Sequence, residues 1–154
     1  MQVVNRESRV QAWRTAGRML LIVVALAGSG AMARDMLRVG VGAAQFNVEL
    51  ARTPAQRQRG LMFRQDMPRE SGMLFMQEAG PAVFWMKNTH IPLDILYFDA
   101  EGRLLEIVAA APPCHTPECP LYPSASAAVR YILEINAGEA ARRGIQTGDR
   151  LVLP

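Results

Sequence analysis

The sequence has little of what marks a recognisable active site. It contains two cysteines and two histidines among 154 residues. It shows no familiar pairing of a nucleophile with a base, no cluster of metal ligands, no glycine-rich phosphate loop and no paired carboxylates at a readable spacing. These absences favour a binding or accessory function over catalysis, and they give no reason to expect a cofactor or a bound metal.

Excess positive charge is also scarce once the amino end is set aside. Four of the 17 basic residues and one of the 14 acidic residues precede Arg34, so 13 of each remain from there on. The formal net charge of +3 at pH 7 therefore comes from the amino end. A balanced chain without a basic stripe is a poor match to nucleic acid or to an anionic membrane surface, and we expect neither as a partner.

The first 33 residues have the three parts of a cleavable secretory signal peptide. Arginines up to Arg18 precede an apolar run from Met19 to Ala27, and small residues follow as far as Ala33. The run is shorter than the roughly 20 residues that a membrane-spanning helix needs. No cysteine follows it, as a lipoprotein anchor would require. We predict a signal peptide over 1–33, a periplasmic or secreted protein, and no stable membrane anchor after cleavage.

Short apolar segments separated by Gly, Pro, Asp and Asn predict strands in the rest of the chain. We expect an N-terminal extension over 34–45 and one domain over 46–154, mainly β, with about seven short strands and two short helices. Such a pattern indicates a small β-sandwich or a barrel-like fold. The strands are expected at 46–51, 72–76, 82–87, 93–98, 103–110, 129–135 and 150–153, and the helices at 53–60 and 137–143.

Both cysteines, Cys114 and Cys119, lie in a proline-rich loop over 111–126. Two nearby cysteines in an oxidising compartment usually pair, so we predict a disulfide. The alternative is a metal site with His115 as third ligand, but the spacing is wider than C-x₂-C and the local sequence supplies no fourth ligand. The frequent methionines leave a similar choice between Cu(I) binding and filling gaps in the core, and core packing is favoured.

The densest polar cluster lies where one predicted strand ends and the next begins. Trp85, Lys87, Asn88 and Thr89 end the first, and Asp94 lies within the second. Strand alternation places Asp94 on the same face as Leu96 and Phe98. If that face is the core, the carboxylate must find a cation or several N–H donors.

Lys87, Arg64 or Arg57 could pair with Asp94, and His90 is a lone titratable group beside them. The cluster is then either a structural corner or a ligand cleft with Trp85 as a stacking wall.

Four separated blocks resemble the bacterial and archaeal family known as domain of unknown function 192. They are 57–64, 72–75, 84–94 and the segments 133–134, 137–138 and 148–149 near the end of the chain. The resemblance runs from about Phe46 to the end of the chain. It implies a compact β-sandwich-like domain, often exported, without an established activity. It carries over six candidate ligand-binding residues: Arg64, Trp85, Lys87, Asn88, Thr89 and Asp94.

Two classes of function remain open. In the first, the domain is a non-enzymatic binding or accessory module of the cell envelope that holds an unknown small molecule, a glycan or an envelope protein in a cleft at Trp85. In the second, it is a hydrolase or lyase with Asp94 or His90 as base and Lys87 or Arg64 as the holder of an anion. The lack of a recognisable catalytic pairing favours the first.

Overall fold

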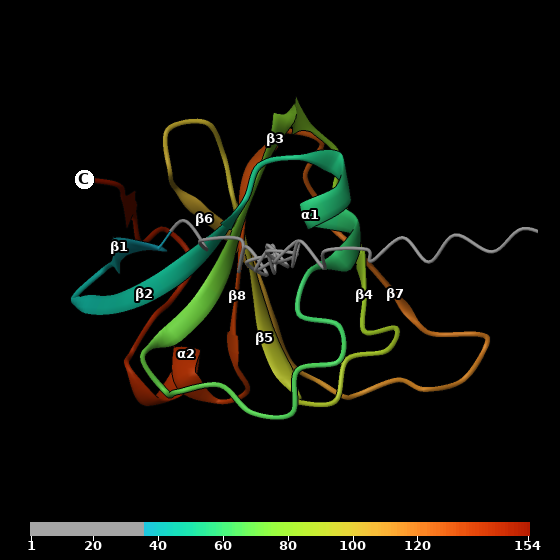
Figure 1. Cartoon of the computed structure of the whole chain (residues 1–154). Helices are drawn as coiled ribbons and strands as arrows, with labels where there is room; N and C mark the ends of the chain where they lie inside the picture. Colours follow the sequence, from blue (N-terminus) through green and yellow to red (C-terminus); the bar gives the residue numbers. More distant parts are fainter. Residues whose placement is uncertain (1–35) are drawn as a thin grey trace, which may run out of the picture. The chain divides into compact units, whose positions relative to one another are not determined.

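The computed structural model describes residues 36–154 (Figure 1), so the predicted signal peptide and its cleavage site lie outside the described residues. Nine strands and two short helices form in this part of the chain. They are β1 (Met36–Val41), β2 (Ala44–Ala51), α1 (Pro54–Arg59), β3 (Ser71–Gly80), β4 (Val83–Trp85), β5 (Leu93–Phe98), β6 (Leu104–Ala111), β7 (Leu121–Pro123), β8 (Val129–Asn136), α2 (Glu139–Arg142) and β9 (Leu151–Val152). Neither helix is long and apolar enough to cross a membrane.

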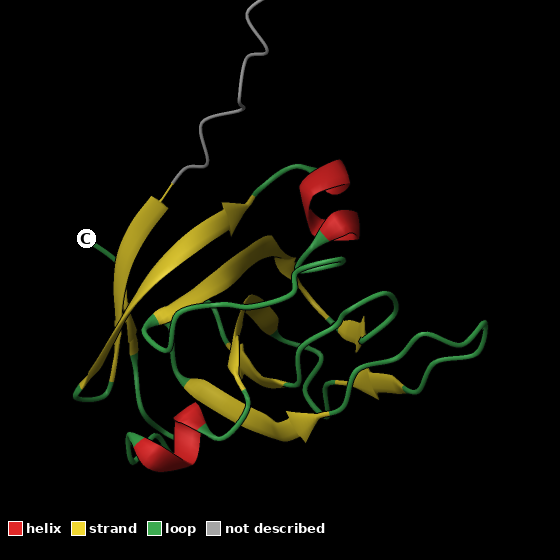
Figure 2. Cartoon of the chain, turned by 60° about the horizontal axis from the view of Figure 1, so that its bottom comes forward, coloured by secondary structure: helices red, strands yellow, loops and turns green. Residues whose placement is uncertain are grey.

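Seven strands form one curled sheet in the order β6-β5-β8-β3-β2-β1-β9, antiparallel except for the parallel pair β2–β3. Its two edges meet at a bridge between Arg103 and Arg150. Beside that bridge the Leu104 N–H donates to the Asp149 carbonyl at 2.7 Å. Figure 2 shows the curl of the strands. The mainly β, barrel-like fold with two short helices is therefore confirmed.

The sheet begins earlier than the sequence indicated, because residues of the expected extension 34–45 form a strand. β1 pairs with β2 along its whole length and with β9 at its end. Gly42 supplies the positive φ of 56° that the tight turn into β2 requires. Val39 and Val41 are buried in the core.

A second, two-stranded sheet pairs β4 with β7. It lies on the same side of the main sheet as α1 in Figure 1. β7 falls inside the proline-rich segment that was expected to be a loop, and β4 is shorter than the strand expected over 82–87. Pro123 can end β7 because this ribbon is not part of the main sheet and needs few backbone donors.

The main sheet buries apolar side chains on both faces. The inner face, enclosed by the curl, includes Phe46, Leu74, Leu96 and Leu133. The outer face, which the β4–β7 ribbon and the neighbouring loops cover, carries a second cluster that includes Met73, Phe75, Met86, Ile95 and Tyr97. Met73 and Met86 pack in this core, as the gap-filling reading predicted. Consecutive residues of β5 and β8 thus point to opposite faces.

Helix α1 brings its carboxyl end close to the outer face. Thr53 and Gln56 form a capping box, Pro54 lies in the first turn, and Gly60 ends the helix at φ 47°. A side chain at Gly60 would meet the ring of Phe75 at 3.3 Å, so glycine also permits this close approach. The predicted helix start and stop are confirmed, and residues 57–62 become one wall of a pocket.

Candidate ligand pocket around Glu134

Glu134 is a buried acid on the outer face of the sheet. It lies on β8 between Met73 of β3 and Ile95 of β5, and only 5% of the residue is exposed. Its carboxyl group forms no hydrogen bond or ion pair among residues 36–154. No fully buried side-chain oxygen in that range lacks a partner, so the Glu134 oxygens reach the surface of a pocket that the residue lines. A buried carboxyl group without a partner costs free energy that folding alone does not recover.

The cavity itself has a volume of about 30 Å³, within about 280 Å³ of empty space that includes open solvent. Leu61, Phe75 and Phe84 contribute apolar surface, and Trp85 contributes an indole ring that is 44% exposed. Its acidic and hydroxyl groups come from Glu134 and Thr89, and its basic groups from Lys87, Arg57 and Arg59. The pocket therefore combines apolar surface with several convergent polar groups, as small-molecule sites do.

Burial raises the pKa of Glu134 to about 8. The carboxyl group is therefore mainly protonated at pH 7, since the charged form is the one that burial penalises. A neutral carboxylic acid donates one O–H and still accepts hydrogen bonds. The pocket thus presents a donor at its buried end without a fixed negative charge.

Two of the basic groups at the pocket have no acidic partner in the described part of the chain. The Lys87 ammonium lies over the Trp85 ring, with Nζ 5.2 Å from the centroid, and neither Lys87 nor Arg59 forms an ion pair there. Arg57 is different, because its guanidinium donates to the carbonyl groups of Arg52 and Met76. Lys87 and Arg59 remain available to a ligand.

Asp94 does not belong to this pocket. As predicted from strand alternation, it points with Leu96 toward the inner face, and it is 1% exposed. Its two oxygens accept backbone hydrogen bonds from Ala110 at 2.8 Å and from Ala140 at 3.0 Å. The expected pairing with Lys87, Arg64 or Arg57 is wrong, because these two N–H groups satisfy the carboxylate.

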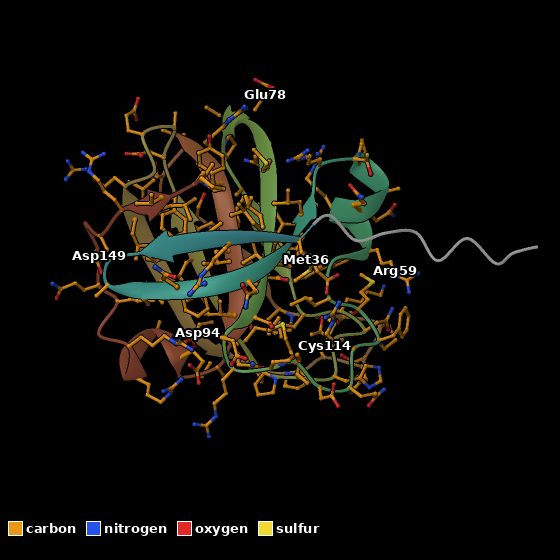
Figure 3. The ribbon with its side chains drawn as sticks, turned by 60° about the vertical axis from the view of Figure 1, so that its left-hand side comes forward. Met36, Arg59, Glu78, Asp94, Cys114 and Asp149 are labelled. Atoms are coloured by element: carbon orange, nitrogen blue, oxygen red, sulfur yellow. A yellow bond between two sulfur atoms is a disulfide. The ribbon has the colours of Figure 1, made fainter. Side chains whose placement is uncertain are left out.

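The Asp94 bonds serve two backbone features that need them. Helix α2 has a glycine N-cap, Gly138, without a side-chain cap, so Asp94 supplies the missing acceptor from a neighbouring strand. Ala110 has a positive φ of 51° where the β5–β6 register shifts, and the second bond holds it there. Asp94 lies beside α2 in Figure 3.

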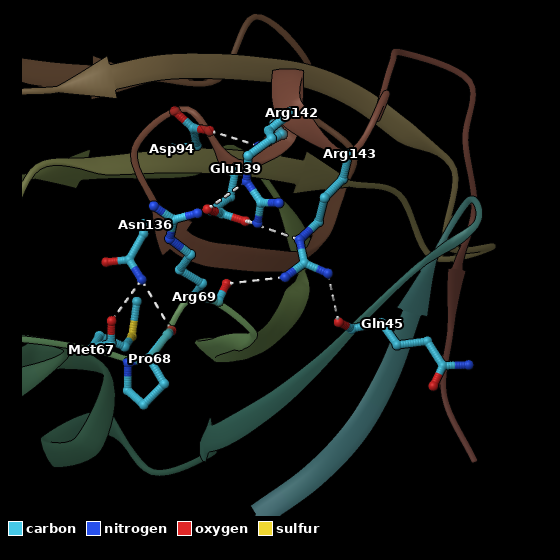
Figure 4. Close-up of polar contacts among 10 residues, drawn as sticks. Gln45, Met67, Pro68, Arg69, Asp94, Asn136, Glu139, Arg142 and Arg143 are labelled. Carbon is cyan, nitrogen blue, oxygen red and sulfur yellow. Dashed lines mark hydrogen bonds and ion pairs between the residues drawn. The ribbon is translucent and has the colours of Figure 1, made fainter.

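Around α2, Glu139 forms ion pairs with Arg142 and Arg143, which lower the pKa of its carboxyl group, Arg142 having the larger effect. The Asn136 amide donates to the carbonyl groups of Met67 and Pro68 (Figure 4). This network joins α2 to the loop before β3, and we assign it a structural role.

The other predicted site residues divide between structure and pocket. Arg64 pairs with Glu49 at 2.6 Å and does not line the pocket. Asn88 takes a positive φ of 55°. Its carbonyl accepts a hydrogen bond from the Phe63 N–H, and its N–H donates to the Cys114 carbonyl. Thr89 is buried and lines the pocket.

His90 lies outside the pocket lining. Its ring lies near that of His115, with centroids 4.8 Å apart and the ring planes tilted by 55°, and contacts the Gln65 amide at 3.4 Å. Of the six residues carried over from the family, Trp85, Lys87 and Thr89 therefore meet at one pocket.

The predicted disulfide between Cys114 and Cys119 forms, in place of the alternative metal site. Cys114 also holds the segment 85–89, which contributes Trp85, Lys87 and Thr89 to the pocket. The Cys114 N–H donates to the Met86 carbonyl, and the Cys114 carbonyl accepts from the Asn88 N–H at 2.8 Å. Within 36–154, no three His, Cys, Asp or Glu side chains gather as metal ligands.

Sequence reasoning missed Glu134 as a site residue. The signal was present, since Glu134 interrupts an apolar strand in the same way as Asp94 does. Sequence alone could not show that one acid meets two backbone donors and the other meets none.

A comparison with known families identifies the chain. The family model DUF192, described as "Uncharacterized ACR", matches residues 37–153. The chain belongs to the DUF192 family. No curated protein matches this DUF192 chain.

Two solved structures resemble the DUF192 chain at 39% sequence identity. A protein of unknown function from Novosphingobium aromaticivorans DSM 12444 has a TM-score of 0.71, with 76% of this chain and 84% of that chain covered. A protein from Sinorhizobium meliloti 1021, described as a "putative transcription regulator", has a TM-score of 0.73, with 80% of this chain and 97% of that chain covered. Both support the fold described above.

Proposed function

We propose that this DUF192 chain is an exported, non-enzymatic binding module of the cell envelope whose pocket at Glu134 holds a small molecule. The observation that supports the proposal is the buried Glu134 carboxyl group, which opens into a pocket and has no partner among residues 36–154. A ligand that exchanges hydrogen bonds with this group offsets its desolvation. Sites that hold groups which folding alone would not keep are typically functional.

The disulfide is consistent with a protein outside the cytoplasm, since such bonds persist in oxidising compartments. Export itself rests on the signal-peptide pattern of the first 33 residues. We expect amino-terminal sequencing of protein recovered from the envelope to begin at Arg34. A chain that still begins at Met1 would contradict cleavage.

The hydrolase or lyase alternative required a base and a basic anion holder in one site, and the structure does not bring those residues together. Asp94 is occupied by two backbone N–H groups on the inner face, so it does not share a site with Lys87. His90 and Arg64 do not line the pocket that Lys87 lines. The description of the Sinorhizobium relative does not guide our proposal either, because basic and acidic residues are balanced after residue 33 and nucleic-acid binding depends on a basic surface.

Native mass spectrometry of envelope-purified protein tests the binding function. We expect a small bound mass in the wild type, loss of that mass in Glu134→Gln, and its retention in Glu101→Gln, which alters an exposed acid in a turn. Trp85 offers a second readout, because the other tryptophan, Trp13, precedes the predicted cleavage site. A bound mass that survives Glu134→Gln would place the ligand elsewhere.

A further inference from the structure

We propose that the ligand of this pocket is a small monocarboxylate with an apolar body, held between the Lys87 ammonium and the Glu134 carboxyl group. This inference rests on the proposed function and names the class of its ligand. It follows from the charges at the pocket, from the gap between two of its groups, and from its apolar lining.

The charges favour an anion. Lys87, Arg57 and Arg59 line the pocket, and Glu134 is its only acidic residue among 36–154. Lys87 is also the only lysine in the sequence, where 16 arginines supply every other basic side chain. A cationic ligand would have to approach Lys87 and Arg59 and to ionise a buried acid, and both steps are unfavourable.

The two groups at the centre of the inference lie in the same pocket without touching. Lys87 and Glu134 form no ion pair within 4.0 Å, although both line the pocket. A carboxylate has two oxygens, so one oxygen can accept from the ammonium and the other from the Glu134 O–H. Both hydrogen bonds involve a charged group, which makes them stronger than neutral ones.

The apolar lining of the pocket indicates what the carboxylate of the ligand is attached to. Leu61, Phe75, Phe84 and Trp85 offer apolar and aromatic surface beside the polar groups. A phosphate ester would bring a second negative charge beside Glu134, which offers a single O–H donor, whereas a monocarboxylate brings one charge. A carboxylate attached to a ring or a short hydrocarbon fits both the donors and the surface.

Binding should also depend on pH, because ionised Glu134 loses its donor and repels the ligand. The groups facing Glu134 are apolar on β3 and β5 except for Tyr97, whose hydroxyl donates to the Tyr122 carbonyl at 2.7 Å. Lys87 and Thr89 come from the 84–89 segment, and Arg57 and Arg59 come from the last turn of α1. The ion pair of Glu49 with Arg64 lies beyond Met73.

The experiment uses envelope-purified protein and three probes of matched size: benzoate, neutral benzamide and cationic benzylamine. Each is titrated while Trp85 fluorescence is excited at a wavelength the probes do not absorb, with the Trp85 indole NMR signal as a second readout. We expect benzoate to bind at least tenfold more tightly than either other probe. Its affinity should fall at least tenfold as pH rises through about 8.

Three variants make the test specific. Lys87→Met should weaken the binding of benzoate at least tenfold. Glu134→Gln should remove most of the pH dependence of that binding. Arg38→Met, which removes one exposed charge on β1, should change neither the affinity nor its pH dependence. Tighter binding of benzylamine, or equal binding of benzamide, would overturn the monocarboxylate class and leave the pocket as a binding site. Failure of every probe, together with the absence of a bound mass, would overturn the proposed function as well.

Discussion

Two acidic side chains embedded in apolar strands show how much depends on single residues. Asp94 and Glu134 lie on neighbouring strands, and their strand positions differ by one register step, because Asp94 pairs with Ile135. That step sends Asp94 to two backbone donors and Glu134 to a pocket in which its carboxyl group forms no hydrogen bond with residues 36–154. The first acid stabilises the fold, and the second is available to a ligand.

Asp94→Ala should lower the free energy of unfolding by about 2–4 kcal/mol, because two buried N–H groups lose a charged acceptor. Lys87→Met should cost less than about 0.5 kcal/mol, since Lys87 has no ion pair among the described residues. We expect the double variant to be additive within about 0.5 kcal/mol in urea unfolding, as for residues without shared partners. A coupling above about 1 kcal/mol would mean that Lys87 and Asp94 interact.

For single residues, the sequence predicts which face of a sheet a side chain occupies better than it predicts which groups the side chain contacts. Period-two alternation placed Asp94 correctly beside Leu96 on a core face. It could not indicate that α2 folds back over that face and donates the Ala140 N–H, because that contact joins residues 46 positions apart. The predicted salt bridge failed for this reason.

Among the elements, the pocket depends most on the short segment from Trp85 to Thr89. The segment leaves β4, turns at Asn88 and is held by backbone hydrogen bonds to Cys114. The ring closed by the disulfide fixes Cys114 in its loop. The disulfide therefore supports the wall that carries Lys87 and Thr89.

Replacing both cysteines with serine should lower the free energy of unfolding by roughly 2 kcal/mol, the loop-closure entropy expected for so short a ring. We also expect faster hydrogen exchange at the Asn88 amide, which donates to Cys114, and unchanged exchange at Leu74 in the middle of β3. Hydrogen exchange followed by NMR separates these two positions. Equal protection at Asn88 with and without the disulfide would show that the bond does not support the pocket wall.

The elements also show where sequence patterns are sufficient. β5 matches its predicted bounds, 93–98, because an apolar run ends at a clear turn. β1 and β7 were missed, since glycine in one and proline near the other are residues typical of loops. β1 forms a tight hairpin with β2 and also pairs with the distant β9, and β7 pairs with the distant β4. Local patterns do not contain the pairings with β9 and β4.

In the domain formed by residues 36–154, the two faces of one curled sheet differ in what they contribute. The inner face encloses a closed apolar core, with Asp94 satisfied at its edge. The outer face packs under the β4–β7 ribbon and leaves a pocket at Glu134. The fold class could be predicted from strand spacing, whereas the pocket required the tertiary arrangement of 57–62, 84–89 and β8.

The raised pKa of Glu134 has a consequence for the stability of this domain. The pKa of Glu134 is near 4.5 in the unfolded state and about 8 in the folded state. At pH values between these two, the folded state holds a proton that the unfolded state has lost. The contribution of Glu134 is therefore fully present below about pH 4.5 and is lost as the pH rises to about 8, which amounts to several kcal/mol. In Glu134→Gln this loss should be absent.

The most direct test of the account is the carbon-13 NMR titration of the Glu134 side-chain carboxyl group in the mature protein, assigned by its absence in Glu134→Gln. We predict a midpoint near pH 8, and a higher midpoint with benzoate bound, because the ligand favours the protonated form. A midpoint near 4.5 that benzoate does not move would contradict a buried, unpartnered acid that receives a ligand.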